Sequence, residues 1–467
     1  MQEKFENFRS KYPVFIYKDY HIDVVENEYV KLTYDFEIPG LCEFHPTNQI
    51  RISNLKIVND PKSVSAEKIA FSLGMVELIS YWKPVCCPIV KVCCGHLSTE
   101  DKAWWKKLYF GGLGEFLFKN TITTSFDAFM TIETEPENEG ENCDTGLVDS
   151  VNSFVNKGFK IIPVGGGKDS NVTMELTKPF SDKVFCFTVN DQPAREESAA
   201  CAGYTDARII RTFRTLDKNM LELNSKGFLN GHTPFSAIVA FLSAYCAYII
   251  GAEHIILSNE SSANESNIEG SDVNHQYSKS YEFETDFQKY FKNYIGVPIQ
   301  YFSLLRAFNE LQIAKQFAAY KKYHGVFKSC NAGSKKNIWC CDCAKCLFVY
   351  IILSPFLTEE EMKNIFGENL LDREDLKEIF DGLAGFSEVK PFECVGTHIE
   401  INAALKATAE KYETENSKMP YLLKYYRSRT PHENDEFVEL LNEFNTENSI
   451  PDAFKNAIEE MYAYVKK

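Results

Sequence analysis

Between residues 159 and 305 the chain alternates short apolar runs with longer amphipathic segments. The apolar runs are FKIIPV, KVFCFTV, ARIIRTF, EHIILS and IQYFSLL, and helix-like stretches such as SNVTMELTK, REESAACAG and YEFETDFQKYFKNYI lie between them. Strands that alternate with helices pair in parallel, because each connection must cross one face of the sheet. The sequence therefore predicts an α/β fold with a doubly wound, mainly parallel sheet.

The regions on either side differ from this pattern. The chain of 467 residues is long enough for two or three domains. Residues 1–146 mix strand-like and helix-like pieces, including the alternating YVKLTYDFEI, and predict an N-terminal α+β domain that ends in an acidic linker, ETEPENEGENCDTG (133–146). Residues 147–355 form the predicted α/β domain, which ends in a cluster of cysteines. Residues 356–467 are predicted to be helical.

Charge and composition exclude several classes of protein. Lys and Arg number 50 against 66 Asp and Glu, so the net charge of −16 argues against nucleic acid as a partner. The first ten residues lack the apolar stretch of a secretion signal, and AIVAFLSAYCAYIIG (237–251) is too short to cross a bilayer, so it is predicted to be a buried helix. We therefore expect a cytoplasmic protein without a membrane partner. The sequence specifies no oligomeric state.

A glycine-rich loop follows the first apolar run of the α/β region. Gly165, Gly166 and Gly167 precede Lys168, Asp169 and Ser170, and a helix-like segment follows directly. Backbone amides in such a loop can turn toward a bound phosphate, and the helix N-terminus favours the negative charge. A Walker A loop would need Ser or Thr where Asp169 stands, and a dinucleotide fingerprint would need glycine at Ser170. A glycine-rich turn without a ligand remains the alternative.

Downstream, four cysteines have the spacing of a metal site. Cys340, Cys343 and Cys346 are separated by two residues each, and Cys330 supplies a fourth thiol. This spacing predicts a structural Zn²⁺ site, with an iron–sulfur centre or simple packing as alternatives. The second cysteine-rich stretch, CCPIVKVCCGH (86–96), is interpreted as small apolar side chains in a core.

The glycine loop resembles the pyrophosphate loop of the ATP pyrophosphatase superfamily, Ser-Gly-Gly-x-Asp-Ser, with Gly165 in place of the first serine. The resemblance implies an adenine nucleotide alpha hydrolase-like fold and cleavage of ATP between its α and β phosphates. It also implies that Asp169 helps to hold Mg²⁺ and that Lys168, Ser170 and the loop amides hold pyrophosphate. Several members carry a similar four-cysteine zinc site.

Four further stretches narrow the resemblance: YFGGLGEFLFKN (109–120), LSNESSANESN (257–267), VNHQYSKSYEFE (273–284) and KPFECVG (390–396). Together with the loop and the cysteine-rich WCCDCAKC (339–346) they resemble the UDP-N-acetylmuramoyl-L-alanyl-L-glutamate epimerase family, MurL. The family implies epimerisation of the terminal L-glutamate of a UDP-linked muramoyl dipeptide in peptidoglycan synthesis, with ATP leaving as AMP and diphosphate.

Candidate proton-transfer groups in these polar stretches are Glu260, His275 and Lys279, with His232 more remote. Each could instead be an ordinary surface or hydrogen-bonding residue. The basic run that contains Arg208, Arg211 and Arg214 could receive phosphates or form a solvated face. The alternative functions are another adenylating enzyme, such as a ligase or amidotransferase for a small carboxylic acid, a non-catalytic nucleotide-binding module, and a Walker-type kinase or hydrolase.

Overall fold

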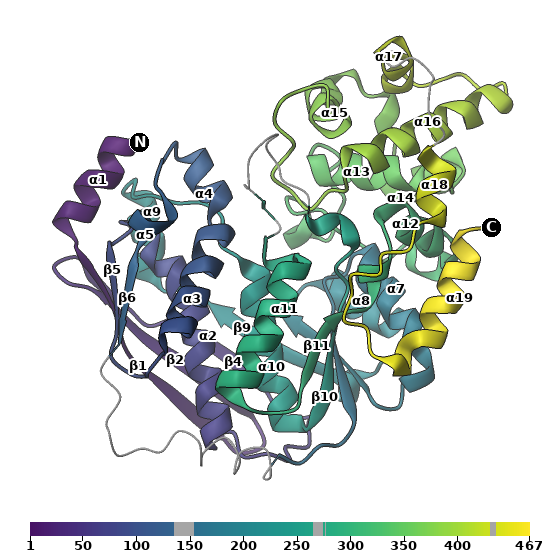
Figure 1. The fold of residues 1–467 in the computed structure, drawn as a ribbon. Helices are drawn as coiled ribbons and strands as arrows, with labels where there is room; N and C mark the ends of the chain where they lie inside the picture. Colours follow the sequence, from purple (N-terminus) through teal and green to yellow (C-terminus); the bar gives the residue numbers. More distant parts are fainter. Residues whose placement is uncertain (135–153, 265–273, 276, 430–435) are drawn as a thin grey trace.

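A computed structural model describes residues 1–134, 154–264, 274–275, 277–429 and 436–467 (Figure 1). Most of the predicted acidic linker, including the predicted boundary after residue 146, lies outside these ranges. Within them the strands form one 11-stranded sheet with helices packed around it. The α/β class is therefore confirmed.

The order of the strands across the sheet is β11-β10-β7-β8-β9-β4-β2-β1-β5-β6, and β3 pairs with β2 beside this path. Their bounds are β1 (Val14–Val25), β2 (Tyr29–Ile38), β3 (Cys42–Phe44), β4 (Thr47–Arg51), β5 (Ile89–Val92), β6 (Thr131–Thr134), β7 (Phe159–Pro163), β8 (Val184–Val189), β9 (Ile209–Thr215), β10 (Ala252–Leu257) and β11 (Gln300–Ser303).

The half of the sheet formed by β7 to β11 is parallel throughout, as the alternation of strands and helices predicted. From β7 the chain first moves outward to β8 and β9, and it then returns to place β10 and β11 on the other side of β7. The order reverses between β7 and β10. A crevice forms outside the carboxyl ends of the strands at such a reversal, and this is where open α/β sheets bind ligands.

The other half of the sheet is mixed, so the prediction of a mainly parallel sheet holds for only part of it. The long strands β1 and β2 are antiparallel, and β4 pairs antiparallel with β9 through contacts such as Asn48 with Arg214. The sheet therefore continues from the N-terminal region into the α/β region. In β2 every second residue is buried, as its alternating sequence predicted.

Some helices pack against the sheet, and the later ones pack mainly on other helices. Their bounds are α1 (Gln2–Lys11), α2 (Val64–Trp82), α3 (Thr99–Gly112), α4 (Gly114–Lys119), α5 (Phe126–Phe129), α7 (Lys168–Leu176), α8 (Pro193–Cys201), α9 (Lys218–Ser225), α10 (Phe235–Ile250), α11 (Tyr281–Tyr290), α12 (Glu310–Ala319), α13 (Ala344–Leu353), α14 (Glu359–Phe366), α15 (Lys377–Ala384), α16 (His398–Thr414), α17 (Tyr421–Arg429), α18 (Glu436–Asn442) and α19 (Lys455–Val465). In the described part of the chain after residue 355 the regular elements are helices, as predicted.

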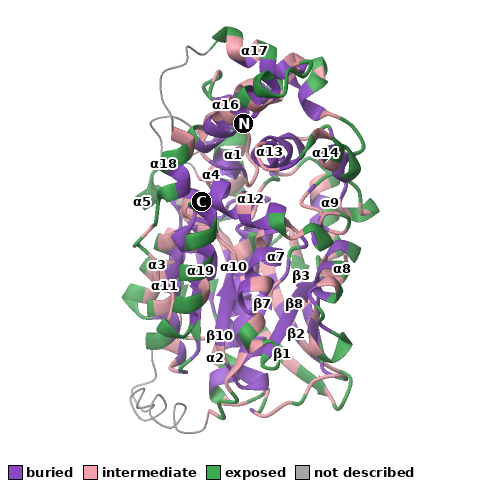
Figure 2. Ribbon diagram, turned by 90° about the vertical axis from the view of Figure 1, so that its right-hand side faces the viewer, coloured by how far each residue is buried: buried purple, intermediate pink, exposed green. Residues whose placement is uncertain are grey.

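Two hydrophobic cores lie on opposite faces of the parallel half. Consecutive residues of one strand enter different cores: Ile161 packs with α2, α10 and α11, whereas Ile162 packs with α7, α12 and α13. Side chains alternate across a strand, so a strand covered on both faces needs apolar residues throughout. Figure 2 shows the central strands β7, β8 and β10 as buried, with exposed residues on outer helices such as α3 and α8.

Helix α10 is almost entirely buried, which confirms the prediction of a core helix. No helix within the described ranges is both long enough and apolar enough to span a membrane.

The side chains of the basic run, Arg208, Arg211 and Arg214, make contacts within the fold. Arg214 binds the buried carboxylate of Glu77 through two nitrogens at 2.7 Å each, Arg211 pairs with Glu196 and Asp206, and Arg208 stacks on the Phe185 ring.

Candidate active site

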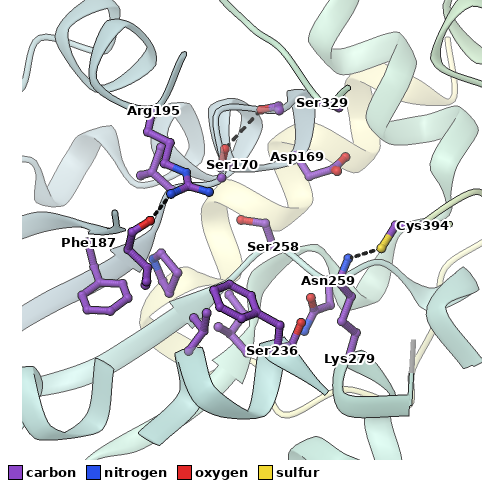
Figure 3. A pocket seen from close by; sticks show the side chains of 18 of the residues that line it. Asp169, Ser170, Phe187, Arg195, Ser236, Ser258, Asn259, Lys279, Ser329 and Cys394 are labelled. Carbon is purple, nitrogen blue, oxygen red and sulfur yellow. Dashed lines mark hydrogen bonds between the residues drawn. The ribbon is translucent and has the colours of Figure 1, made fainter. Parts of the chain in front are cut away.

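A cavity of about 310 Å³ lies at the carboxyl ends of β7, β8 and β10, where the strand order reverses. The glycine loop after β7 forms one wall, and Ser258 and Asn259 after β10 form another. Segments farther along the chain complete it, with Ser329 and Cys394 among others (Figure 3). The fold therefore brings the loop together with residues that are distant from it in the sequence.

The three glycines of the loop have different surroundings. Gly166 has a φ of +82°, and a Cβ at this position would lie 3.0 Å from the Ala194 backbone. A Cβ on Gly167 would lie 2.6 Å from the Ser329 hydroxyl, whereas one on Gly165 would meet no atom within 4 Å. Gly165, Gly167, Asp169 and Ser170 line the cavity, and Gly166 instead fixes the turn against α8. The space at Gly165 leaves room for the serine of the superfamily pattern.

These surroundings predict that alanine is tolerated at Gly165 but not at Gly166. Gly166→Ala places a side chain on a backbone with positive φ and brings its Cβ close to the Ala194 backbone. The strain costs about 1–3 kcal/mol of conformational free energy, and we expect the loop to move to relieve it. We expect nucleotide affinity and turnover to fall by at least about 10-fold. Gly165→Ala should bind nucleotide as the parent does. Titration with ATP, monitored by calorimetry, tests both variants, and equal affinities would contradict this role of the loop.

Helix α7 begins at Lys168, directly after the loop. Gly167 occupies the N-cap position, so no capping side chain accepts a hydrogen bond from the first turn. Its first backbone N–H groups are thus available at the cavity, and the helix dipole favours an anion there. Ser170 lies in this first turn, and its hydroxyl donates to the carbonyl of Gly167 at 3.1 Å. Loop and helix together have the geometry of a phosphate site.

Lys168 is only 1% exposed and is not among the described residues that line the cavity. Its ammonium group pairs with the carboxylates of Asp169 and Glu310. Burial opposes ionisation of Asp169, but the positive charges of Lys168 and Lys345 hold its pKa below the ordinary value. Burial raises the pKa of Glu310 to about 8, although Lys168 counteracts this shift. In this structure, Lys168 thus secures the side chain of Asp169, which is 27% exposed.

The charges of the cavity contrast with the acidic composition of the chain. Its described lining contains three cationic residues, Arg195, Lys279 and Lys345, against the single carboxylate of Asp169. The guanidinium of Arg195 donates to the carbonyls of Val189 and Asn190 at the end of β8. The cavity therefore suits a ligand that carries several negative charges.

One polar group at the cavity lacks a protein partner. The Ser258 hydroxyl is buried, and it has no hydrogen bond to any residue that the structure describes. A buried hydroxyl without a partner is unfavourable unless a ligand or water provides one. Because Ser258 follows β10 at the strand reversal, a bound molecule could accept its hydrogen bond.

The predicted proton-transfer residues occupy different places. Lys279, at the end of the short 3₁₀ helix Tyr277–Lys279, lines the cavity, and its Nζ lies 3.0 Å from Sγ of Cys394. His275 is not a lining residue, but it hydrogen-bonds to the same thiol, and its Nδ1 lies 2.5 Å from Oε2 of Glu115. Glu260 is buried and does not belong to the described lining. His232 lies behind His275, 3.4 Å from Glu115.

Among the lining residues that carry a charge or a thiol, sequence reasoning missed three: Arg195, Lys345 and Cys394. Two of them lie in stretches that carried the resemblance, Lys345 between two predicted zinc ligands and Cys394 within KPFECVG. Arg195 opens the helix-like REESAACAG. Motif membership was thus an available signal for Lys345 and Cys394, but it did not show that their side chains face the glycine loop.

The four predicted cysteine ligands converge. Their Sγ atoms all lie within 4.8 Å of one another, with separations of 3.9 Å for Cys330–Cys343, 3.7 Å for Cys340–Cys346 and 3.5 Å for Cys343–Cys346. Four sulfurs placed tetrahedrally at about 2.3 Å from a zinc ion would be about 3.8 Å apart. The thiols therefore fit one ion, and they are too close together to surround a multi-iron cluster. The neighbouring Cys341 turns away, with its Sγ 3.3 Å from the carbonyl of Phe366.

The cysteine cluster supports one wall of the cavity. Ser329 and Asn331 flank Cys330, and Lys345 lies between Cys343 and Cys346. The backbone N–H of Lys328 donates to the carbonyl of Gly166 at 2.8 Å, which joins this wall to the loop. In the CCPIVKVCCGH stretch, Cys86 and Cys87 are buried, as the packing interpretation predicts, whereas Cys93 is exposed.

Comparison with known proteins places these features in one family. Residues 6–304 match the family model of the MurL N-terminal domain, and residues 326–438 match that of the MurL C-terminal domain. The chain belongs to the MurL family. The glycine loop falls in the first family domain, and Ser329, Lys345 and Cys394 fall in the second. Both MurL domains therefore contribute to the cavity.

Curated relatives agree with this assignment. A UDP-N-acetyl-alpha-D-muramoyl-L-alanyl-L-glutamate epimerase from Xanthomonas oryzae pv. oryzae is 31% identical over 84% of this chain and 85% of the relative. Proteins of the same name from Micromonospora sp. and Salinispora tropica are each 30% identical over 85% of this chain and over 87% and 85% of their own lengths, respectively. No solved structure matches the chain.

Proposed function

We propose that this protein is an ATP-dependent amino-acid epimerase of peptidoglycan precursor synthesis. Its substrate is UDP-N-acetylmuramoyl-L-alanyl-L-glutamate, whose terminal L-glutamate becomes D-glutamate while ATP is cleaved to AMP and diphosphate. Family membership and the names of the three relatives support the reaction. The observation that carries the proposal is the shared cavity, in which the glycine loop faces Lys345, a cationic residue of the second MurL domain.

The two parts of the cavity suit the two parts of ATP. Phe187 and Val189 on β8, with Phe235 and Val239 on α10, offer an apolar slot for the adenine ring. The amides of the glycine loop and the first turn of α7 are assigned to the phosphates, and Ser170 adds a hydroxyl. Parallel strands on both sides of the reversal point support the adenine nucleotide alpha hydrolase-like arrangement of the pyrophosphatase superfamily.

Asp169 is the residue assigned to Mg²⁺. Its carboxylate is ionised and partly exposed at the end of the phosphate loop, and Mg²⁺ prefers carboxylate and phosphate oxygens. When bound, the ion would neutralise phosphate charge and stabilise the departing diphosphate. Lys168 positions Asp169 from the interior side of the helix, which is a different role from the direct phosphate contact predicted from the sequence.

Adenylation explains why an epimerase would consume ATP. The α-carbon of glutamate bears an ionised carboxylate, and removal of its proton would place a second negative charge beside the first. A mixed anhydride with AMP removes the carboxylate charge, so that the carbanion electrons can delocalise into the acyl carbonyl. Water then releases AMP from the epimerised acyl group. Lys279 and Lys345 stand in the cavity as cations that can hold the carboxyl group against the α-phosphate.

We assign Zn²⁺ to the four converging thiols of Cys330, Cys340, Cys343 and Cys346. Their separations support a single tetrahedral ion. Four protein ligands leave no coordination position open for a substrate, which is typical of a structural site. The ion would fix the segment that carries Ser329 and Lys345. The need for ATP and for reduced cysteines supports a cytoplasmic location.

Incubation of the protein with ATP, Mg²⁺ and the UDP-linked dipeptide tests the proposed function. We expect AMP, diphosphate and D-glutamate, the last detected by chiral analysis after hydrolysis. ADP and orthophosphate would contradict the assigned cleavage. AMP formation only with other carboxylic acids would support a different adenylating enzyme, and the absence of AMP under all conditions would leave a binding module.

A further inference from the structure

A single thiol stands where the loop of one MurL domain faces the residues of the other. Cys394 lines the cavity that also contains Asp169 and Gly165, and Figure 3 shows its sulfur directed at the amine of Lys279. The segment that carries it is held in place, because the ammonium of Lys345 donates to the carbonyl of Cys394 and the Lys345 N–H donates to Glu393 at 2.9 Å. Of the cysteines in the described ranges, no other one lines this cavity.

We propose that the thiolate of Cys394 is one of the two groups that exchange the α-proton of the activated glutamate residue. This inference rests on the proposed function. In the removal step, the sulfur lone pair takes the proton, the C–H electrons remain on the α-carbon and delocalise into the acyl carbonyl, and an S–H bond forms. A second acid returns a proton to the opposite face of the carbon, and water then displaces AMP.

The surroundings of the thiol favour its ionised form. Burial opposes ionisation, but the positive charge of Lys279 and a hydrogen bond with His275 lower the thiol pKa to about 6. The positive charge of Lys345 also lowers the thiol pKa. Glu393, the residue before Cys394, is the carboxyl group on the segment that carries the thiol. Glu115 and His232 lie behind His275. At neutral pH most of this thiol is therefore available as a base.

Two of the residues predicted from the sequence, Lys279 and His275, are less suited to accept the proton. Burial lowers the pKa of Lys279, but the neighbouring Cys394 and Glu260 outweigh this effect and raise it, so the amine stays protonated. His275 is likewise held protonated: burial lowers its pKa, while hydrogen bonds to Cys394 and Glu115 raise it to about 9. Both side chains therefore act as positioning residues that stabilise the thiolate, in the way that a carboxylate-oriented histidine serves a cysteine nucleophile.

The deciding experiment separates adenylation from proton exchange in Cys394→Ser. Parent and variant are incubated in D₂O with ATP, Mg²⁺ and the UDP-linked dipeptide, and exchange of labelled diphosphate into ATP is measured beside α-deuterium incorporation. We expect the variant to retain exchange within a few-fold, and to lose about 10³-fold in deuterium incorporation and D-glutamate formation. The matched control Cys93→Ser removes an exposed cysteine outside the cavity and should retain both activities.

The outcomes are distinguishable. Normal deuterium incorporation by Cys394→Ser would overturn the proton-transfer role, as would loss of both activities in a folded variant, which would place the thiol in adenylation. If the parent itself forms no AMP, the proposed function fails and this inference fails with it.

A second measurement does not depend on turnover. The rate of alkylation of the Cys394 peptide by iodoacetamide, followed by mass spectrometry, should rise with pH around a midpoint near 6. Lys279→Met should move this midpoint upward toward the ordinary thiol value of about 8.5. The same ionisation should appear as an acidic limb in the epimerisation rate, because activity is lost as pH falls through the thiol pKa. An unshifted midpoint in Lys279→Met would overturn the proposed stabilisation of the thiolate.

Discussion

Asp169→Asn is expected to abolish AMP formation while the fold is retained. The substitution keeps the size of the side chain but removes the negative charge that is assigned to Mg²⁺ at the phosphate loop. We expect turnover to fall by roughly 10³-fold or more, since the ion would stabilise charge that develops on the departing diphosphate. The loss should be smaller at high Mg²⁺ concentration if weakened ion binding causes it. AMP release at increasing Mg²⁺ concentrations measures both effects.

Glu175→Gln is a matched control on the same helix. Glu175 also lies in α7, it pairs with Lys322 at 2.9 Å, and its substitution makes the same change of charge outside the cavity. This variant should form AMP at the rate of the parent, and circular dichroism should show that both variants are folded. Full activity of Asp169→Asn, or equal losses in the two variants, would refute the assigned role of Asp169.

Local patterns were sufficient to predict the elements of the parallel half. Each strand from β7 to β11 lies at a predicted apolar run, because a strand covered on both faces needs apolar residues at consecutive positions. The pairing of β4 with β9 could not be predicted in this way, since β4 (Thr47–Arg51) contains polar residues and its partner is far away in the sequence. Register and neighbours depend on contacts that no single segment encodes.

The same limit applies to the candidate site. The glycine loop was recognisable because its backbone geometry and the following helix are encoded within a few residues. The inward direction of Lys168 was not, because it depends on Glu310 at the start of α12, a distant segment that packs beside α7. Cys394 was missed for a similar reason: its significance comes from Lys279 and His275, two residues of a different segment. Long-range packing, rather than motif content, decides which polar residues face one another.

Loss of the zinc site should have the other large effect. We expect one zinc ion per chain in the purified protein, measured by inductively coupled plasma mass spectrometry, and a small fraction of that amount in Cys346→Ser. Metal ligation contributes directly to folding, so the variant should lose several kcal/mol of stability and unfold roughly 10 °C lower. Turnover should fall as well, because the segment that carries Ser329 and Lys345 forms a wall of the cavity.

Cys341→Ser provides the control for this prediction, since it makes the same chemical change within the same WCCDCAKC stretch. The Cys341 thiol points to the carbonyl of Phe366 and away from the other four, so the variant should keep its zinc. Equal zinc content in the two variants would contradict the ligand assignment, and iron in place of zinc in the parent would contradict the choice of metal. Zinc loss with unchanged turnover would show that the four-thiol site stabilises the chain without shaping the cavity.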